Sequence, residues 1–226
     1  MFFDGKAPFI AGAIARGELH PCGILAICPV SLQRREVSLN TTRIANLDAT
    51  RTDVLSGALP DLFEQVWTCA RFLTASVPGF ENAAFSGIAP RIGIRETRRI
   101  MGEVVLTRDD VLTGRKREDG ICKGAHELDV HGAGTAHRRE MIRDGGSYDI
   151  PYGMLLARGV PNLMVVGRCM SASRVAHSSA RVMASLLMLS TLCAPSAISG
   201  GSARRISKRP GHITRRRPSR TASRAS

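Results

Sequence analysis

The feature that most constrains the fold is a short apolar run that ends in a glycine, within residues 162–171. The run reads Asn-Leu-Met-Val-Val-Gly-Arg-Cys-Met-Ser, and Gly167 closes its apolar part. An apolar run of this length between turn signals is typical of a buried strand. A glycine there lets a ligand approach the backbone, and Ser178 or Ser179 would cap a following helix whose free N–H groups face the same place. This order predicts an α/β protein that holds an anionic or electron-rich ligand.

The charge of the chain is unevenly distributed. The 226 residues carry a formal net charge of +13, which at first suggests a nucleic-acid partner. Residues 204–226 hold nine Lys or Arg and no acid, whereas the rest of the chain holds 23 basic and 19 acidic residues, a net charge of +4. We therefore expect a globular body with a basic tail. We do not expect nucleic acid as a partner, because the tail has no aromatic residue for base stacking.

The six cysteines are scattered and none forms a C-x-x-C pair, which is typical of reduced thiols in a cytosolic protein. Asp4 and Lys6 follow the first three residues, so no signal peptide is expected. The apolar stretch at residues 183–198 is short for a bilayer span and contains Pro195. We expect a cytoplasmic protein without a membrane partner.

Apolar spacing predicts helices over residues 7–19 and 61–75 and strands over residues 23–28, 36–40 and 88–95. Thr107, with Asp109 and Asp110 after it, predicts the start of another helix. Residues 132–146 are polar and contain glycine, which favours a loop. The alternation of strands and helices indicates an α/β or α+β class. From about residue 190 Ser, Arg, Pro and Gly dominate, which predicts disorder.

Several segments in series resemble the FAD-dependent oxidoreductases related to the heterodisulfide reductase A flavoprotein. The segments are Asn40-Thr41-Thr42-Arg43-Ile44, Val77-Pro78-Gly79-Phe80-Glu81, Pro90-Arg91-Ile92-Gly93-Ile94-Arg95-Glu96-Thr97, Leu128-Asp129-Val130-His131, Gly146-Ser147-Tyr148-Asp149-Ile150-Pro151-Tyr152 and residues 162–183. The resemblance implies an α/β fold, with an α+β substrate or cap region over residues 1–150 and a partial Rossmann-like FAD domain over residues 151–190. A disordered basic tail over residues 191–226 completes the chain.

The sequence departs from that family in two places. The G-x-G-x-x-G turn that holds the FAD pyrophosphate has no counterpart, because Gly12, Gly17 and Gly23 are wrongly spaced and follow no strand. After Met183 a leucine-rich stretch and the basic tail replace the expected alanine- and glycine-rich helix, which suggests a frameshift near residue 185. We therefore expect a fragment with an incomplete FAD site, and a partner chain that supplies the pyrophosphate site. An iron–sulfur cluster is implied by family association only.

The resemblance implies which residues hold the cofactor. Gly167, Arg168 and Ser171 would lie along the ribityl and pyrophosphate side of FAD. Ser178 and Arg181 would open a helix near the pyrimidine edge, where a helix N-terminus stabilises the negative charge of reduced flavin. The alternative is that Gly167 makes a tight turn and Arg181 forms a surface salt bridge.

Four residues are candidates for catalysis. Arg95 and Arg98 suit an anionic substrate or a cofactor phosphate, but they also have Glu96 within reach and could instead brace the two domains. His131 is either a general acid or base or a structural histidine that donates to a carbonyl. Tyr152 either offers its hydroxyl to substrate or flavin or packs at the domain junction.

A metal site is not expected. His126, His131 and His137 are separated by five and six residues, and this spacing does not place them on one helical face. The sequence thus predicts hydride transfer between a flavin and an unidentified small-molecule substrate, weak or absent in the chain alone. The alternatives are a noncatalytic domain that completes a flavoprotein in trans and a nucleic-acid binder that acts through its basic tail.

Overall fold

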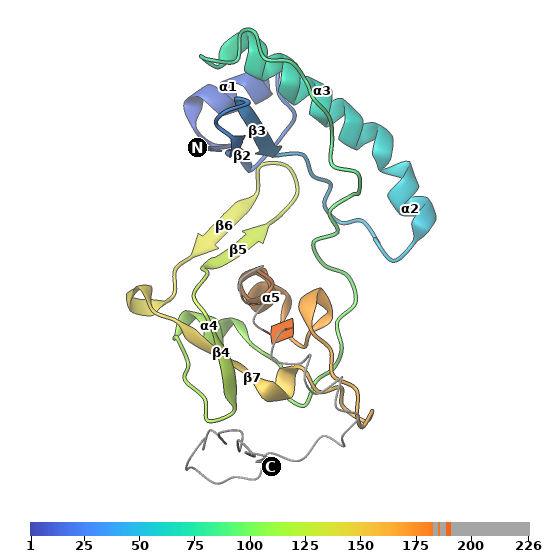
Figure 1. Cartoon of the computed structure of the whole chain (residues 1–226), viewed down its shortest axis with the longest axis vertical. Coiled ribbons are helices and arrows are strands. Elements are labelled where there is room, and N and C mark those ends of the chain that lie inside the picture. The colour runs from blue at the N-terminus through green and yellow to red at the C-terminus, as the bar shows by residue number, and fades with distance from the viewer. Residues whose placement is uncertain (183–184, 186–188, 191–226) are drawn as a thin grey trace, which may run out of the picture.

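The chain forms two lobes with a β-hairpin between them (Figure 1). The structure, a computed structural model, describes residues 1–182, 185, 189 and 190. The N-terminal lobe begins with an antiparallel sheet in the order β1 (Phe2–Asp4), β2 (Ile24–Ser31) and β3 (Glu36–Asn40). Both β2 and β3 lie where the sequence predicts strands.

Helices cover one face of this sheet. They are α1 (Pro8–Ala15) and α3 (Leu59–Ser76), and the short α2 (Thr52–Gly57) precedes α3. Cys69, Phe72 and Leu73 are the buried residues of α3, and they pack with Ile10 of α1 and Leu25 of β2 in one core. Their spacing of three and four residues places them on one helical face, which confirms the predicted helix.

The C-terminal lobe has its own core. It contains α4 (Arg108–Leu112), the antiparallel pair β4 (Gly120–Gly124) and β7 (Tyr148–Pro151), and α5 (Arg174–Ala180). Tyr148 is fully buried, and its hydroxyl lies 2.9 Å from Ser179 Oγ of α5. This hydrogen bond satisfies the phenol and joins β7 to α5, so Tyr148 has the packing role that a buried tyrosine commonly takes.

The hairpin of β5 (Leu128–His131) and β6 (His137–Glu140) extends from the C-terminal lobe toward the N-terminal sheet (Figure 1). At its base, Ser178 Oγ of α5 accepts a hydrogen bond of 3.0 Å from the backbone N–H of Asp129. The prediction of a loop over residues 132–146 is only partly correct, because β6 lies within this range. Gly132 and Ala136 close the turn through a backbone hydrogen bond of 2.8 Å.

The sheets do not have the topology of a Rossmann-like domain. Every pair of named strands in the described residues is antiparallel, whereas a dinucleotide-binding domain has a parallel sheet. The architecture is a mixture of helices and small antiparallel sheets, and the predicted partial Rossmann-like piece over residues 151–190 is not confirmed.

Two predicted strands do not form. In the run at 163–166 only Met164 makes an isolated bridge, with Leu156, and the chain then enters a 3-10 turn over Gly167–Cys169. Met164 and Val166 are partly buried against the C-terminal core, whereas Leu163 is 44% exposed. Residues 88–95 have no strand partner either. Hydrophobic pattern alone does not distinguish a buried extended segment from a strand in a sheet.

The start of the last described helix is also different from the prediction. Ser173 is the N-cap of α5, and its Oγ accepts a hydrogen bond of 3.3 Å from the N–H of Ala176. Ser178 and Ser179 lie buried inside α5, and Arg181 follows its last residue. These three residues therefore lie at the C-terminal end of a helix, where the dipole favours cations and not the negative charge of reduced flavin.

None of the helices in the described part of the chain has both the length and the apolar character that crossing a bilayer requires. The proposed frameshift near residue 185 and the basic tail over residues 191–226 fall outside the described residues, apart from Ser185, Leu189 and Ser190.

The predicted helix start at Thr107 is confirmed as a capping box. Thr107 Oγ1 accepts from the N–H of Asp110 at 3.2 Å, and Asp110 Oδ2 accepts from the N–H of Thr107 at 2.9 Å. Replacing Thr107 with Ala should therefore lower the free energy of unfolding by about 1 kcal/mol, measured by urea denaturation. Thr113→Ala, at the other end of α4, is the matched control and should change it by less than about 0.5 kcal/mol. Equal losses in the two variants would contradict the capping role.

Candidate functional site

The hairpin gathers four side chains with useful chemistry on one face. Its register pairs His131 with His137 and Asp129 with Arg139. Residues two apart in a strand share a face, as do residues directly opposite each other in an antiparallel pair. The rings of His131 and His137 accordingly lie with their centroids 4.6 Å apart. The turn thus forms a compact polar cluster from residues that are up to ten positions apart in sequence.

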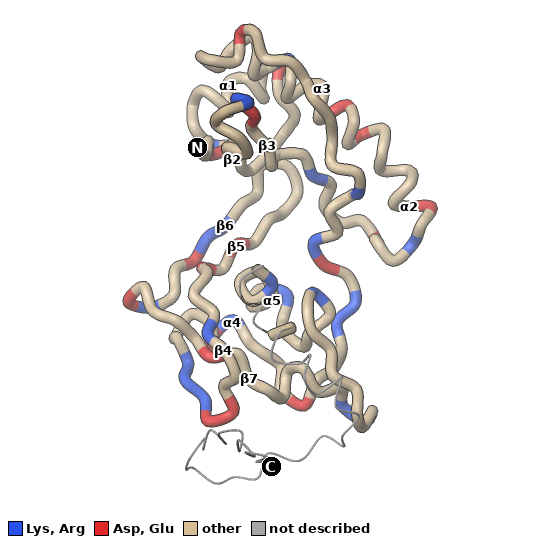
Figure 2. Tube along the Cα trace, viewed as in Figure 1, with Lys and Arg blue, Asp and Glu red and all other residues tan. Residues whose placement is uncertain are grey.

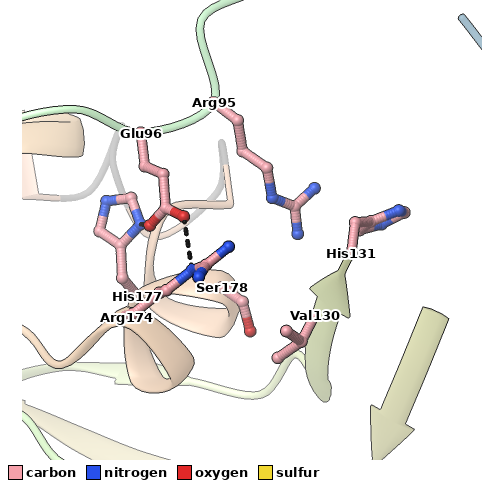
Figure 3. A pocket seen from close by; sticks show the side chains of 7 residues that line it. All are labelled: Arg95, Glu96, Val130, His131, Arg174, His177 and Ser178. Atoms are coloured by element: carbon pink, nitrogen blue, oxygen red, sulfur yellow. Dashed lines mark hydrogen bonds and ion pairs between the residues drawn. The ribbon is translucent and has the colours of Figure 1, made fainter. Parts of the chain in front are cut away.

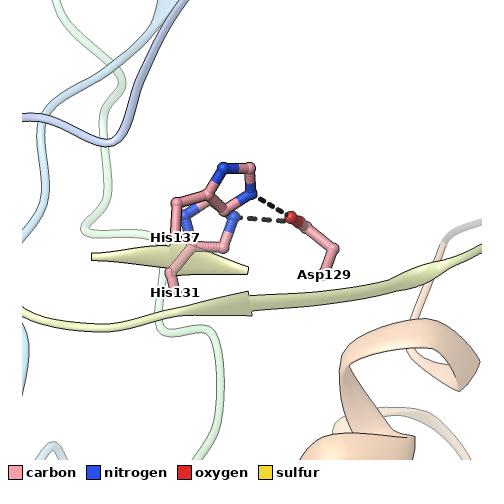
Figure 4. Close-up of side chains that lie close together, drawn as sticks. All are labelled: Asp129, His131 and His137. Atoms are coloured by element: carbon pink, nitrogen blue, oxygen red, sulfur yellow. Dashed lines mark hydrogen bonds and ion pairs between the residues drawn. The ribbon is translucent and has the colours of Figure 1, made fainter. Parts of the chain in front are cut away.

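Asp129 is the centre of this cluster (Figure 4). Its Oδ2 lies 2.9 Å from His131 Nε2, and its Oδ1 lies 2.6 Å from His137 Nε2. Only 13% of the side chain is exposed. Burial by itself would raise the pKa of Asp129, but the hydrogen bonds from the two histidines and the charge of Arg95 hold that pKa well below its usual range. These contacts favour the charged form of Asp129.

Arg43 of the N-terminal lobe fixes the tautomer of His131. Its Nη1 lies 2.6 Å from His131 Nδ1, and its Nη2 donates to the carbonyl oxygens of Gly134 and Ala136. A guanidinium has only donors, so Nδ1 of His131 must accept. The ring proton is then on Nε2, from which it is donated to Asp129. Both nitrogens of His131 are occupied, and His131 has no free site from which to act as a base.

The position of Arg43 depends on a second contact. The backbone N–H of Arg43 donates to Gln65 Oε1 of α3 at 2.8 Å, and Gln65 Nε2 donates back to the carbonyl of Arg43 at 3.1 Å. The guanidinium also lies against Gly23, where an added Cβ would approach Nη2 to 2.9 Å. Arg43 therefore joins α3 and the N-terminal sheet to the hairpin.

Asp129, His131 and His137 also satisfy the distance requirement for three metal ligands, because one potential ligand atom from each lies within 4.8 Å of the others. The expectation of no metal was based on the spacing of residues along a helix, whereas these residues meet across a hairpin. The hydrogen bonds give a better argument. A metal on His131 Nε2 would displace the proton while Arg43 occupies Nδ1, and this would require an imidazolate. Arg95 and Arg139 add positive charge beside Asp129 at 3.5 and 3.6 Å.

A small hollow lies beside the cluster, which we call the arginine hollow (Figure 3). It is lined by Arg95, Glu96, Val130, His131, Arg174, His177 and Ser178. Its volume of about 10 Å³ is room for roughly one water molecule. The hollow therefore fits a single polar group of a ligand, and a flavin ring does not fit inside it.

Glu96 organises the lining of the arginine hollow. Its carboxylate accepts from Arg174 Nε at 3.0 Å and from Arg99 Nη1 at 3.0 Å. Arg168 Nη1 holds the same segment by donating to the carbonyl of Ile94 at 2.8 Å. Burial lowers the pKa of Arg181, and the positive charge of Arg95 lowers it further. The four guanidinium groups of Arg95, Arg99, Arg174 and Arg181 thus outnumber the two neighbouring carboxylates, Glu96 and Asp129. Basic positions mark the hairpin and the extended segment between the lobes (Figure 2).

The predicted site residues are only partly brought together. Arg95, His131 and Ser178 line the arginine hollow, and Gly167 and Arg168 lie next to it through the contact of Arg168 with the segment of Arg95. The others lie apart from the hollow. Arg98 is exposed, Ser171 is 1% exposed and packs against Gly102, and Tyr152 follows β7 with its N–H bonded to the carbonyl of Asp119 at 2.8 Å.

No catalytic or binding role was predicted from the sequence for five residues of the two sites. Asp129 and His137 belong to the Asp129 cluster and Arg43 contacts it, while Arg174 and His177 line the arginine hollow. A signal for two of them was present. Asp129 and His131 alternate in a strand-like segment, and a glycine-containing turn separates them from His137. Alternation on both sides of such a turn is typical of a hairpin. Arg43 is 88 residues from His131, and no local pattern predicts that contact.

Comparison with known families gives one match. The family model described as FAD dependent oxidoreductase matches residues 14–194, which is most of the chain. The chain belongs to this family. Comparisons with curated proteins and with solved structures found no match. Membership supports a flavin-related redox function and FAD as the cofactor.

The described residues fit part of an FAD dependent oxidoreductase site. Gly167 has a positive φ of 85°, and a Cβ built there would meet nothing within 4 Å, so its backbone is open to a ligand. Arg181 Nε is buried without a hydrogen-bond partner, as is Ser171 Oγ. No described strand leads through a glycine-rich turn into a helix, so the described residues offer no pyrophosphate cradle. Gly167, Arg168 and Arg181 would hold the flavin side, and the cofactor itself supplies the redox chemistry.

Substitution of Arg43 tests whether its contacts with the hairpin stabilise the fold. Replacing it with Met leaves His131 Nδ1 and two turn carbonyls without their donor, so the free energy of unfolding should fall by about 1–3 kcal/mol in urea denaturation. The control is Arg16→Met, which removes an exposed ion pair with Glu18 and should leave that free energy nearly unchanged. If the two variants were equally stable, Arg43 would be an ordinary surface arginine.

Proposed function

We propose that this chain supplies the substrate side and the flavin-ring side of an FAD-dependent oxidoreductase that transfers hydride between the flavin and a small anionic substrate. A separate polypeptide would supply the pyrophosphate site. The observation that carries the proposal is the arginine hollow, in which Arg95, His131 and Ser178 converge in a chain that matches the family over residues 14–194.

The charge of the hollow supports an anionic substrate. Arg95 and Arg174 both line it, and Glu96 is already shared between Arg174 and Arg99. A carboxylate or phosphate oxygen placed there would receive charge-assisted hydrogen bonds from the guanidinium groups. The small volume suits such a group at the end of a substrate whose body lies outside the hollow.

The roles of the chain's residues differ from one another in this proposal. Arg95 and Arg174 bind and orient the anion. His131 donates a hydrogen bond to Asp129 and so holds this carboxylate beside the hollow. Gly167 and Arg168 lie on the flavin side, next to the segment that carries Arg95. Arg98 and Tyr152 remain candidates for contacts with the larger complex, since Arg98 is exposed and Tyr152 is partly exposed. The relation to heterodisulfide reductase A and a cytoplasmic location belong to the same proposal.

The second candidate is a noncatalytic domain that completes a flavoprotein in trans. It is favoured by the absence of a pyrophosphate cradle from the described residues. Both candidates place the flavin ring against Gly167. They differ in whether a substrate anion binds in the arginine hollow.

Flavin binding tests the proposal directly. Because the phosphate cradle is missing from the described residues, FAD and riboflavin should bind the purified chain weakly and with Kd values within about tenfold of each other, or about 1.4 kcal/mol. The measurement is flavin fluorescence titration. FAD binding that is more than about a hundredfold tighter than riboflavin binding would place a pyrophosphate site in this chain, and no binding of either would contradict the flavin role.

A pair of glycine variants locates the flavin. Gly167→Val places a side chain in the open space at the backbone and should weaken riboflavin binding by at least about tenfold. Gly159→Val is the matched control, because Gly159 also has a positive φ, of 76°, and open space around it. Both variants introduce the same backbone strain, so similar affinities in the two would contradict the placement of flavin at Gly167.

A further inference from the structure

A second cavity also borders the Asp129 cluster, at His137 and Arg139. It is lined by Phe2, Phe3, Asp4, Ile24, His137 and Arg139, and we call it the sheet–hairpin cavity. Its volume is about 270 Å³. That is just below the roughly 300–1,000 Å³ of small-molecule sites, so it suits a ligand with one aromatic ring.

The N-terminal sheet forms one wall of this cavity, which is apolar except for the carboxylate of Asp4. Phe2 pairs with Ala26 and Asp4 pairs with Ile24, so Phe2, Asp4 and Ile24 are on the same face of the sheet. Phe2 is 69% exposed, although a phenylalanine in a folded protein is usually buried. An exposed aromatic ring at a cavity wall offers a surface on which another ring can stack.

His137 provides the polar wall with a free acceptor. Its Nε2 lies 2.6 Å from Asp129 Oδ1, and no described residue is a hydrogen-bond partner of its Nδ1. A carboxylate accepts, so Nε2 carries a proton, and in the neutral ring the lone pair is then on Nδ1. Figure 4 shows Nδ1 directed away from Asp129. His137 therefore differs from His131, whose Nδ1 is occupied by Arg43.

We propose that the sheet–hairpin cavity binds a small aromatic compound that carries a hydroxyl group, and that His137 Nδ1 removes the hydroxyl proton. The O–H bond breaks and an N–H bond forms on Nδ1, with no oxidation or reduction. The resulting imidazolium keeps its Nε2–H bond to the Asp129 carboxylate. The ligand becomes an oxyanion near Arg139, whose guanidinium is 3.2 Å from Glu127 and 3.6 Å from Asp129.

Asp129 is a positioning residue in this step. It orients the imidazole and stabilises the imidazolium, as a carboxylate does behind a catalytic histidine. In Asp129→Asn, His131 still needs an acceptor for its Nε2–H because Arg43 occupies Nδ1. The amide oxygen must then face His131 and the amide NH₂ must face His137. His137 Nε2 would become the acceptor, its proton would move to Nδ1, and the base would be lost.

The probe is 4-nitrophenol, whose phenolate absorbs visible light and whose phenol does not. At a pH slightly below the pKa of the free probe, we expect the wild-type chain to increase the phenolate fraction on binding by several-fold. His137→Gln and Asp129→Asn should bind the probe without this increase. His126→Gln is the control, because His126 is exposed and outside the cavity, and it should behave as the wild type.

Phe2→Ala is a second variant that does not rely on buried groups. Because Phe2 is largely exposed, the variant should fold as the wild type does and bind the probe at least about fivefold more weakly. A wild-type chain that does not bind the probe, or a folded His137→Gln chain that still ionises it, would overturn the proposal. The result does not depend on flavin binding, so it succeeds or fails separately from the proposed oxidoreductase function.

Discussion

The described structure between the two lobes depends on the Asp129 carboxylate. This one side chain accepts from His131 and His137 and lies near Arg95 and Arg139, so it holds both strands of the hairpin and the segment that leads from the N-terminal lobe. A buried carboxylate with this many partners is stable only while it stays charged, because its donors would otherwise lose their acceptor. The network also needs each histidine in one tautomer, which Arg43 and Asp129 fix for His131 and Asp129 fixes for His137.

The two faces of this cluster offer different chemistry. The arginine hollow is small and positively charged, and it suits the end of an anion. The sheet–hairpin cavity is larger and has an aromatic wall and a histidine with a free nitrogen. Asp129 contacts a residue of each lining, His131 of the arginine hollow and His137 of the sheet–hairpin cavity. The hairpin thus contributes to two distinct hollows, through Val130 and His131 in one and through His137 and Arg139 in the other.

Local sequence patterns predicted the elements that are stabilised locally. The helix over residues 59–76 follows from its apolar spacing, and the start of α4 follows from Thr107 and Asp110, because a capping box is made within four residues. The strand predicted at residues 163–166 failed for the opposite reason. A strand needs a neighbour, and in this run only Met164 forms a bridge, while Val166 packs against the core without one and Leu163 is exposed. The serines near residue 178 are good caps in isolation, but Ser173 takes that role and leaves Ser178 to accept from Asp129.

The candidate site was predictable only in part. Arg95 and His131 were candidates because of their chemistry and Ser178 because of the resemblance, and all three line one hollow, but the features that determine the chemistry of the hairpin are tertiary contacts. The contact of Arg43 with His131 decides which histidine is free, and it joins residues on different lobes. The sequence spacing of the histidines gave no information about whether they lie close together, because His131 and His137 meet across a hairpin and not along a helix.

The protonation of the two hairpin histidines is the central claim, and NMR measures it directly. Long-range ¹H–¹⁵N spectra of the histidine-labelled chain at neutral pH, assigned with His131→Gln and His137→Gln, report which ring nitrogen carries the proton. The structure predicts that both His131 and His137 carry it on Nε2, with an unprotonated Nδ1. A proton on Nδ1 of either ring would contradict the arrangement of Arg43, Asp129 and the two histidines described above.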